Sequence, residues 1–239
     1  MTSPFKTWTV LPHGKLFKIN DRILTVVGEI HMPIGEFPRR MTAVRLSDRR
    51  LVIYSAIALD EDEMATLEAF GEPAFMIVPS DRHRLDAPIW KDRYPDLMVI
   101  TPAGGRDKVE EVVSVDAVSA DFGDATVKLI EVPGTERHEA ALEITGADGV
   151  TLVVNEIIGS IHGAKGLSGW ILELMGFAGD EPHIPAAVKI QFSQGKAALA
   201  AQLRRWADVP ALKRIIVSHG DVIDDHPEGV LRQLAESLD

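Results

Sequence analysis

The first third of the chain consists of short apolar runs separated by turn residues. These runs are rich in Val, Ile, Thr and aromatic residues, and they read "TWTVL" (7–11), "ILTVVGEI" (23–30), "MTAVRL" (41–46) and "RLVIYSAI" (50–57). Such runs predict β-strands joined as hairpins. The period then changes in "DEDEMATLEAFG" (60–71), where acidic residues precede apolar Met64, Leu67 and Phe70 at helical spacing, and Gly71 follows. This pattern predicts a helix.

Wholly apolar runs mark the middle of the chain. "PAFMIVPS" (73–80) and "LMVITP" (97–102) are typical of strands covered on both faces, and "APIWKDRYP" (87–95) between them predicts a short helix. A second β-rich group is expected over 109–157, in the runs "VEEVVSV", "ATVKLIEV", "HEAALEIT" and "GVTLVVNEI". The mixture of strands and helices predicts an α+β protein.

The end of the chain alternates helix and strand. A helix interrupted at Gly195 is expected over 185–208, a strand in "LKRIIVSHGD" (212–221), and a final helix that starts at Pro227. The segment 159–181 is rich in glycine and apolar patches. It is open to three interpretations: a mobile lid, a surface for a partner or a second subunit, or a poorly patterned helix.

Composition limits the classes of function. The chain has 239 residues and 46% apolar content, enough to bury a full-sized core as one domain or as two small ones. Its 36 acidic and 25 basic residues give a net charge of -11 without a basic block, which argues against a nucleic-acid partner. No apolar stretch has the length of a signal peptide or a membrane span, so a soluble cytoplasmic protein without a membrane partner is expected.

The absence of cysteine restricts the chemistry further. It removes thiolate nucleophiles, disulfides and Cys-based zinc sites, so any metal must be held by histidines and carboxylates. The sequence also lacks a Gly-x-Ser-x-Gly elbow and a Walker loop. Ser218, His219 and Asp221 are too close along the backbone to form a triad, whose members come from separate segments.

Candidate ligands stand at the ends of predicted strands. Three of the eight histidines have this position, as does one glutamate: His83, His138, His219 and Glu156. Asp81 and Asp86 lie beside His83 in "DRHRLD". Side chains at strand ends can meet at one rim of a fold although they are distant in sequence. Imidazole and carboxylate ligands suit zinc, iron or manganese, and such an ion can activate a water near pH 7.

These elements and motifs resemble the metallo-β-lactamase-like hydrolase superfamily over residues 23–239. The segments "RMTAVRLSDRRLVIYSAIAL" and "VPSDRHRLDAPIWKDRYPDLMVITPAG" are similar to a branch whose ligand motifs are degenerate. The resemblance implies a single domain over 1–239, folded as an αββα sandwich in which two mixed β-sheets are flanked by helices.

The resemblance also implies a ligand set. The superfamily loop His-x-His-x-Asp-His falls on "DRHRLD", so Asp81, His83, Leu85 and Asp86 occupy its four ligand positions. "PGTERHE" resembles the turn of the third histidine and points to His138. Glu156 falls where a bridging Asp is expected, with Asn155 as the competing alignment, and His219 in "SHGD" matches the final histidine. Because Leu85 cannot bind a metal, the resemblance implies a degenerate, mononuclear site.

Each candidate also has an ordinary interpretation. A histidine at a strand end can be a hydrogen-bonded rim residue, Asp81 and Asp86 can cap the following helix, and Glu156 can be a buried acid paired with a base. Trp90 and Tyr94, four residues apart, are expected to pack together on a helix face.

Two functions follow from these observations. The first is a metal-dependent hydrolase that acts on a small molecule through a metal-activated water. In it, His83, Asp86, His138, Glu156 and His219 are metal ligands, and Asp86 and Glu156 also have catalytic roles. The alternative is a binding or assembly module on the same fold that holds no metal and uses 159–181 as its contact surface. An oligomer formed through 159–181 is a further prediction.

Overall fold

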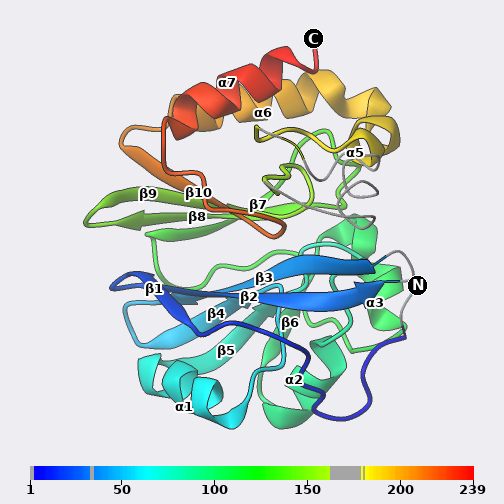
Figure 1. The fold of residues 1–239 in the computed structure, drawn as a ribbon, viewed down its shortest axis with the longest axis vertical. Helices are drawn as coiled ribbons and strands as arrows, with labels where there is room; N and C mark the ends of the chain where they lie inside the picture. The colour runs from blue at the N-terminus through cyan, green and yellow to red at the C-terminus, as the bar shows by residue number, and fades with distance from the viewer. Residues whose placement is uncertain (1–2, 33–34, 162–178, 180) are drawn as a thin grey trace. The chain divides into compact units, whose positions relative to one another are not determined.

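The chain forms two compact units (Figure 1). The computed structural model describes residues 3–32, 35–161, 179 and 181–239. Unit 1 comprises Met1–Met32 and Glu36–Ala125, and unit 2 comprises Pro33–Gly35 and Thr126–Asp239. The prediction of one domain over 1–239 stays a prediction. The predicted α+β class, with two mixed β-sheets flanked by helices, is confirmed.

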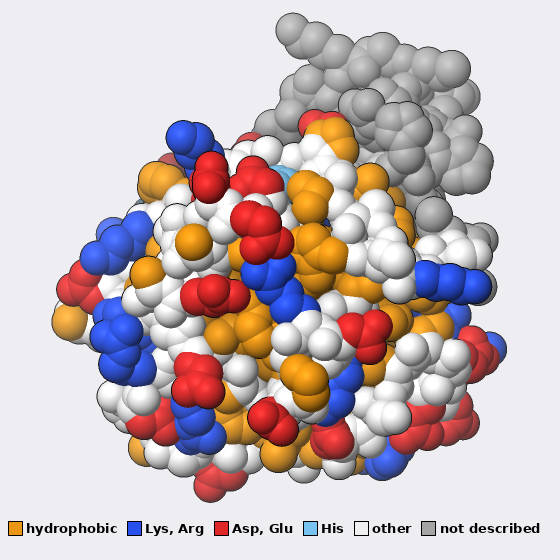
Figure 2. Space-filling view, turned by 90° about the horizontal axis from the view of Figure 1, so that it is seen from below, with side chains coloured by type: hydrophobic (Ala, Val, Ile, Leu, Met, Phe, Trp, Pro, Cys, Tyr) orange, Lys and Arg blue, Asp and Glu red, His pale blue; other side chains and the backbone are white. Residues whose placement is uncertain are grey.

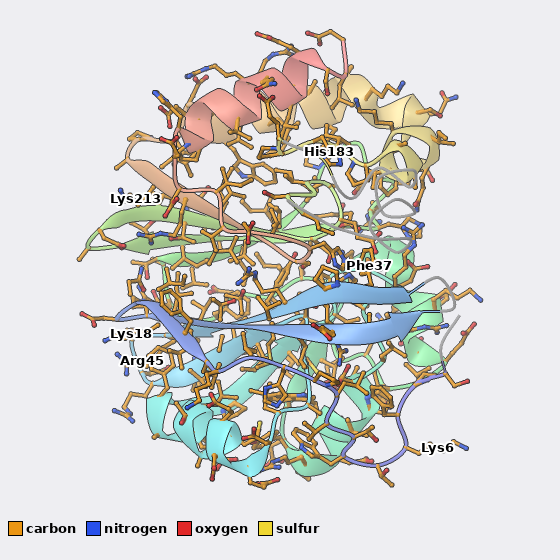
Figure 3. The ribbon with its side chains drawn as sticks, in the orientation of Figure 1. Lys6, Lys18, Phe37, Arg45, His183 and Lys213 are labelled. Carbon is orange, nitrogen blue, oxygen red and sulfur yellow. The ribbon has the colours of Figure 1, made fainter. Side chains whose placement is uncertain are left out.

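Unit 1 contains a six-stranded sheet in the order β1-β2-β3-β4-β5-β6. Its strands are β1 Phe17–Asn20, β2 Ile23–Met32, β3 Gly35–Arg45, β4 Arg50–Tyr54, β5 Glu72–Ile77 and β6 Met98–Ile100, and its helices are α1 Glu61–Phe70, α2 Ala87–Arg93 and α3 Arg106–Glu110. β1 pairs antiparallel with β2, and β3 with β4, whereas β4, β5 and β6 are parallel. Lys18 on β1 and Arg45 at the end of β3 lie at one edge of this unit (Figure 3).

The parallel pairing of β4, β5 and β6 explains why a helix lies between each of these strands and the next in the sequence. Parallel neighbours need a crossover connection, and α1 and α2 provide the two crossovers between β4, β5 and β6. Both helices cover the same face of the sheet (Figure 1). α1 begins where the Asp60 side chain accepts a hydrogen bond from the Glu63 N–H, and its cap at the other end is Gly71, as predicted. The predicted pair of Trp90 and Tyr94 is confirmed, with ring centroids 5.6 Å apart.

Two strands predicted in this unit are absent. The segment 7–11 has no regular structure; its Trp8 instead donates a hydrogen bond to the Leu59 carbonyl and packs on Trp90. The run 109–115 contains the end of α3 and a turn rather than a strand. Val109 and Val113 are buried four residues apart, which is the spacing of a helix, and Val109 lies in α3.

Unit 2 contains a four-stranded sheet in the order β10-β9-β8-β7. Its strands are β7 Val127–Glu131, β8 Ala140–Gly146, β9 Gly149–Val154 and β10 Leu212–Val217, and its helices are α5 Ala186–Gln191, α6 Lys196–Ala207 and α7 Pro227–Glu236. α6 and α7 lie over one face of the sheet (Figure 1). Leu199, Leu203 and Trp206 of α6 are buried at helical spacing, and they belong to one core with Ile215 and Val217 of β10.

The predicted interruption at Gly195 is confirmed, because α5 ends at Gln191 and α6 begins at Lys196. A Cβ on Gly195 would lie 2.0 Å from the carbonyl oxygen of Gly134, so the two backbones touch here. Gly134 itself has a positive φ of 82°. The predicted lid or partner surface at 159–181 falls mostly on residues 162–178 and 180, which lie outside the described residues.

Candidate functional site

Two candidate residues of unit 2 follow neighbouring parallel strands. β9 and β10 pair in parallel with Val154 opposite Val217, and the Ser218 N–H donates to the Val154 carbonyl over 3.1 Å. Lys213 stands near the start of β10 (Figure 3), so the residues after Val217 lie at the other end of that strand. Because the two strands end together, the segments that carry Glu156 and His219 leave the sheet at the same edge.

Glu156 and His219 come together at this edge. A carboxylate oxygen of Glu156 and a ring nitrogen of His219 lie within 4.8 Å of each other. Both residues are buried, at 6% and 5% exposure. The side chains that follow these two strands therefore converge at this edge. A carboxylate and an imidazole at this separation can bind one divalent ion together.

The turn after β10 fixes the backbone of His219. The Ser160 N–H donates to the His219 carbonyl over 3.1 Å, and the Asp221 N–H donates to the Ser160 carbonyl over 2.8 Å. Gly220 between them has a positive φ of 117°, and a Cβ there would lie 2.0 Å from the Ser160 oxygen. The glycine of "SHG" is therefore needed for the close approach of two backbone segments.

Glu139 is a buried residue of this edge that the sequence analysis did not single out. It is 2% exposed and stands directly before β8. Its carboxylate accepts hydrogen bonds from the Asn155 side-chain amide and from the Glu156 N–H, each over 3.3 Å. The strand-end argument that selected His138 applies equally to its neighbour Glu139, so the signal was present in the sequence.

His138 lies in the turn before β8 and is not a member of the group that contains Glu156 and His219. Its backbone N–H donates to the Thr135 carbonyl over 2.9 Å. Its Nδ1 is buried and has no hydrogen-bond partner among the described residues. The role of His138 as a ligand stays a prediction.

In unit 1, His83 lies in the loop that follows β5. Its Nδ1 is 2.7 Å from the hydroxyl of Ser55, the residue directly after β4. The Ser55 N–H donates to the carbonyl of Ile77, the last residue of β5, over 3.0 Å. The ends of β4 and β5 therefore hold the His83 side chain in one place.

Asp86 of the same loop has partners for both carboxylate oxygens. Oδ2 accepts a hydrogen bond from Nη1 of Arg39, and Oδ1 accepts one from the Ala58 N–H over 2.9 Å. Asp86 is 1% exposed and Arg39 is 8% exposed, so this is a buried ion pair. Asp86 stands at the N-cap of α2 but makes no capping hydrogen bond with its side chain. Asp81 is half-buried in the turn after β5.

A surface pocket of unit 1 is lined by other residues. Its volume is about 650 Å³, and its lining includes charged side chains and Tyr94 but none of the predicted ligands. Burial raises the pKa of Tyr94 above its usual range, and the hydrogen bond to Glu68 acts in the same direction. The face in Figure 2 carries acidic and basic side chains interspersed with hydrophobic ones.

Comparisons with known proteins identify the fold. The sequence matches no protein-family model and no curated protein. Its structure is similar to a metallo-β-lactamase from Erythrobacter litoralis, with a TM-score of 0.62. The identity is 13%, and the match covers 93% of this chain and 96% of that one. The chain has the metallo-β-lactamase fold.

Two further structures agree with this assignment. The metallo-β-lactamase FIM-1 from Pseudomonas aeruginosa, in its mono-zinc form, has a TM-score of 0.59 at 12% identity over 95% of this chain and 96% of that one. The metallo-β-lactamase from Hirschia baltica has a TM-score of 0.59 at 11% identity, over 94% and 98%. The fold expected from the resemblance is thus confirmed. No helix within the described ranges combines the length and hydropathy of a membrane span.

Proposed function

We propose that this protein is a metal-dependent hydrolase that acts on a small molecule, with one divalent ion at the strand ends of unit 2. The observation that carries the proposal is the buried pair of Glu156 and His219, with ligand atoms within 4.8 Å of each other, in a chain with the metallo-β-lactamase fold. Zinc, iron and manganese all accept an imidazole and a carboxylate as ligands.

The proposed ligands in unit 2 are His219 and Glu156, and His138 is a further candidate there. His83 of unit 1 stays a predicted ligand. A bound ion of this kind supplies Lewis acidity and activates water near neutral pH. The chain itself holds the backbone of both ligands in place. The turn at Gly220 fixes the backbone of His219, and the Glu139 carboxylate accepts a hydrogen bond from the Glu156 N–H. Buried hydrogen bonds of this kind orient ligands before the ion arrives.

Asp86 is not part of the proposed ligand set. Its two oxygens already accept hydrogen bonds from Arg39 and Ala58, and removing one partner from a buried ion pair is costly. We assign Asp86 the role of holding the loop that carries His83. With Leu85 in the neighbouring position, this leaves a single ion, and one similar structure is likewise a mono-zinc form.

Hydrolysis by the metal-loaded protein tests the proposal. Zinc-, manganese- and iron-loaded samples are assayed against chromogenic esters, lactones, β-lactams and phosphodiesters, each with and without a chelator. We expect at least one substrate to be hydrolysed, with the activity lost in the chelator and in Glu156→Gln. The matched control is Glu143→Gln, which changes a half-buried carboxylate that pairs with Lys128 on the same sheet.

The second candidate is a binding or assembly module on the same fold. The ion pair between Asp86 and Arg39 favours it, because an Asp86 carboxylate that pairs with Arg39 is not available as a metal ligand. This candidate predicts no hydrolysis of any substrate in the panel and no change in stability on adding a chelator. A small-molecule substrate, a cytoplasmic location and an oligomer through 159–181 stay predictions.

A further inference from the structure

Ser55 has an unusual backbone conformation for its position. Six non-glycine residues in the described part of the chain have positive φ, and Ser55, with a φ of 57°, is the one among them that is buried. Its residue exposure is 4%. Positive φ costs a non-glycine residue free energy, and such strain persists where surrounding contacts impose it.

The contacts of Ser55 show what its conformation achieves. Its N–H is fixed by the Ile77 carbonyl at the end of β5, and its hydroxyl lies 2.7 Å from Nδ1 of His83. Glycine would adopt this φ without strain but has no hydroxyl. The side chain therefore has a role that the backbone conformation alone does not require.

We propose that Ser55 is a positioning residue for His83, holding the imidazole as the Nδ1–H tautomer so that Nε2 presents its lone pair to a divalent ion. This inference rests on the proposed function and on the prediction that His83 is a metal ligand. In this arrangement Nδ1–H donates to the Ser55 Oγ. A hydrogen bond at one ring nitrogen selects which nitrogen is available to a metal.

Two variants separate this role from a merely structural one. Ser55→Gly removes the hydroxyl and relieves the strain, so we expect equal or higher resistance to urea but a loss of the tautomer preference. Ser55→Thr keeps a hydroxyl but places a β-branched residue at positive φ, so we expect lower resistance to urea and the parent tautomer. A merely structural role predicts instead that the preference for the Nδ1–H tautomer and the resistance to urea decrease together in each variant.

The decisive measurement is the ¹⁵N chemical shifts of the His83 ring in metal-free protein at pH 8, followed by titration with zinc. We expect the Nδ1–H form in the parent and a shift toward Nε2–H in Ser55→Gly, with zinc affinity about 10- to 100-fold weaker in that variant. Unchanged ring shifts in Ser55→Gly, or an Nε2–H ring in the parent, would overturn the inference. A parent that binds no zinc but shows the expected shifts contradicts the proposed function and leaves the positioning role standing.

Discussion

Asp86 and Glu156 are buried acids that each follow an apolar strand, yet their surroundings differ. Asp86 of unit 1 has one oxygen on the Arg39 guanidinium and the other on a backbone N–H. Glu156 of unit 2 has an oxygen within 4.8 Å of a ring nitrogen of His219, and its own N–H is held by Glu139. A strand-end position brings an acid to the rim, but the neighbouring groups decide whether it serves the fold or a ligand.

The largest expected effect breaks the ion pair of unit 1. Arg39→Met leaves the Asp86 carboxylate buried without its cation, and we expect a loss of about 3–5 kcal/mol in the free energy of unfolding. Urea denaturation measures this loss. In the control Glu61→Gln, the altered carboxylate pairs with Arg93 at the surface, so the unfolding midpoint should stay near that of the parent. Equal midpoints for Arg39→Met and the parent would refute the structural role of Asp86.

The next largest effect concerns the turn that carries His219. Gly220→Ala combines positive φ with a Cβ placed on the Ser160 carbonyl, so we expect a loss of about 3 kcal/mol in unfolding free energy. We also expect weaker zinc binding, because His219 must move with the turn. Denaturation and calorimetric titration measure the two effects. Parent-like zinc affinity in a folded Gly220→Ala protein would show that the turn does not set the position of His219.

A smaller effect is expected at Glu139. Glu139→Leu removes an acceptor from the buried Asn155 amide and from the Glu156 N–H, which should cost about 2 kcal/mol of unfolding free energy. Glu139→Gln retains an acceptor oxygen and should lose less. Denaturation of both variants checks the order. If Leu is tolerated as well as Gln, then Glu139 does not organise this edge.

The smallest effect has the opposite sign and serves as the control for Gly220. Gly229 is exposed inside α7, and the nearest atoms to an added Cβ are 3.9 Å away. Gly229→Ala should therefore raise the free energy of unfolding by about 0.5–1 kcal/mol and leave zinc binding unchanged. A destabilised Gly229→Ala protein would show that the effect at Gly220 is not specific to its turn.

Local sequence pattern predicted most elements because burial sets their periodicity. The runs 23–30, 41–46 and 212–217 became strands, and the acidic start and Gly71 marked α1 correctly. The strand predicted over 109–115 was wrong because its valines also fit a helical spacing. The strand predicted over 7–11 was wrong because Trp8 makes a tertiary contact with the Leu59 carbonyl.

The sequence indicates the proximity of candidate residues where it depends on strand ends, but not where it depends on distant partners. Glu156 and His219 meet because their parallel strands are neighbours. The sequence around Asp86 carries no sign of Arg39, which lies 47 positions away. The strain at Ser55 is likewise a property of the folded backbone, because serine has no preference for positive φ.

Metal content is the most direct test of the central claim that Glu156 and His219 hold one divalent ion. Protein purified without added metal is analysed by elemental mass spectrometry, together with His219→Ala and the control His226→Ala. His226 is exposed beside Glu228 at the start of α7. The account predicts about one ion per chain in the parent and in His226→Ala, and none in His219→Ala. A folded parent without metal that takes up no zinc on titration, or a His219→Ala variant that keeps its ion, would contradict it.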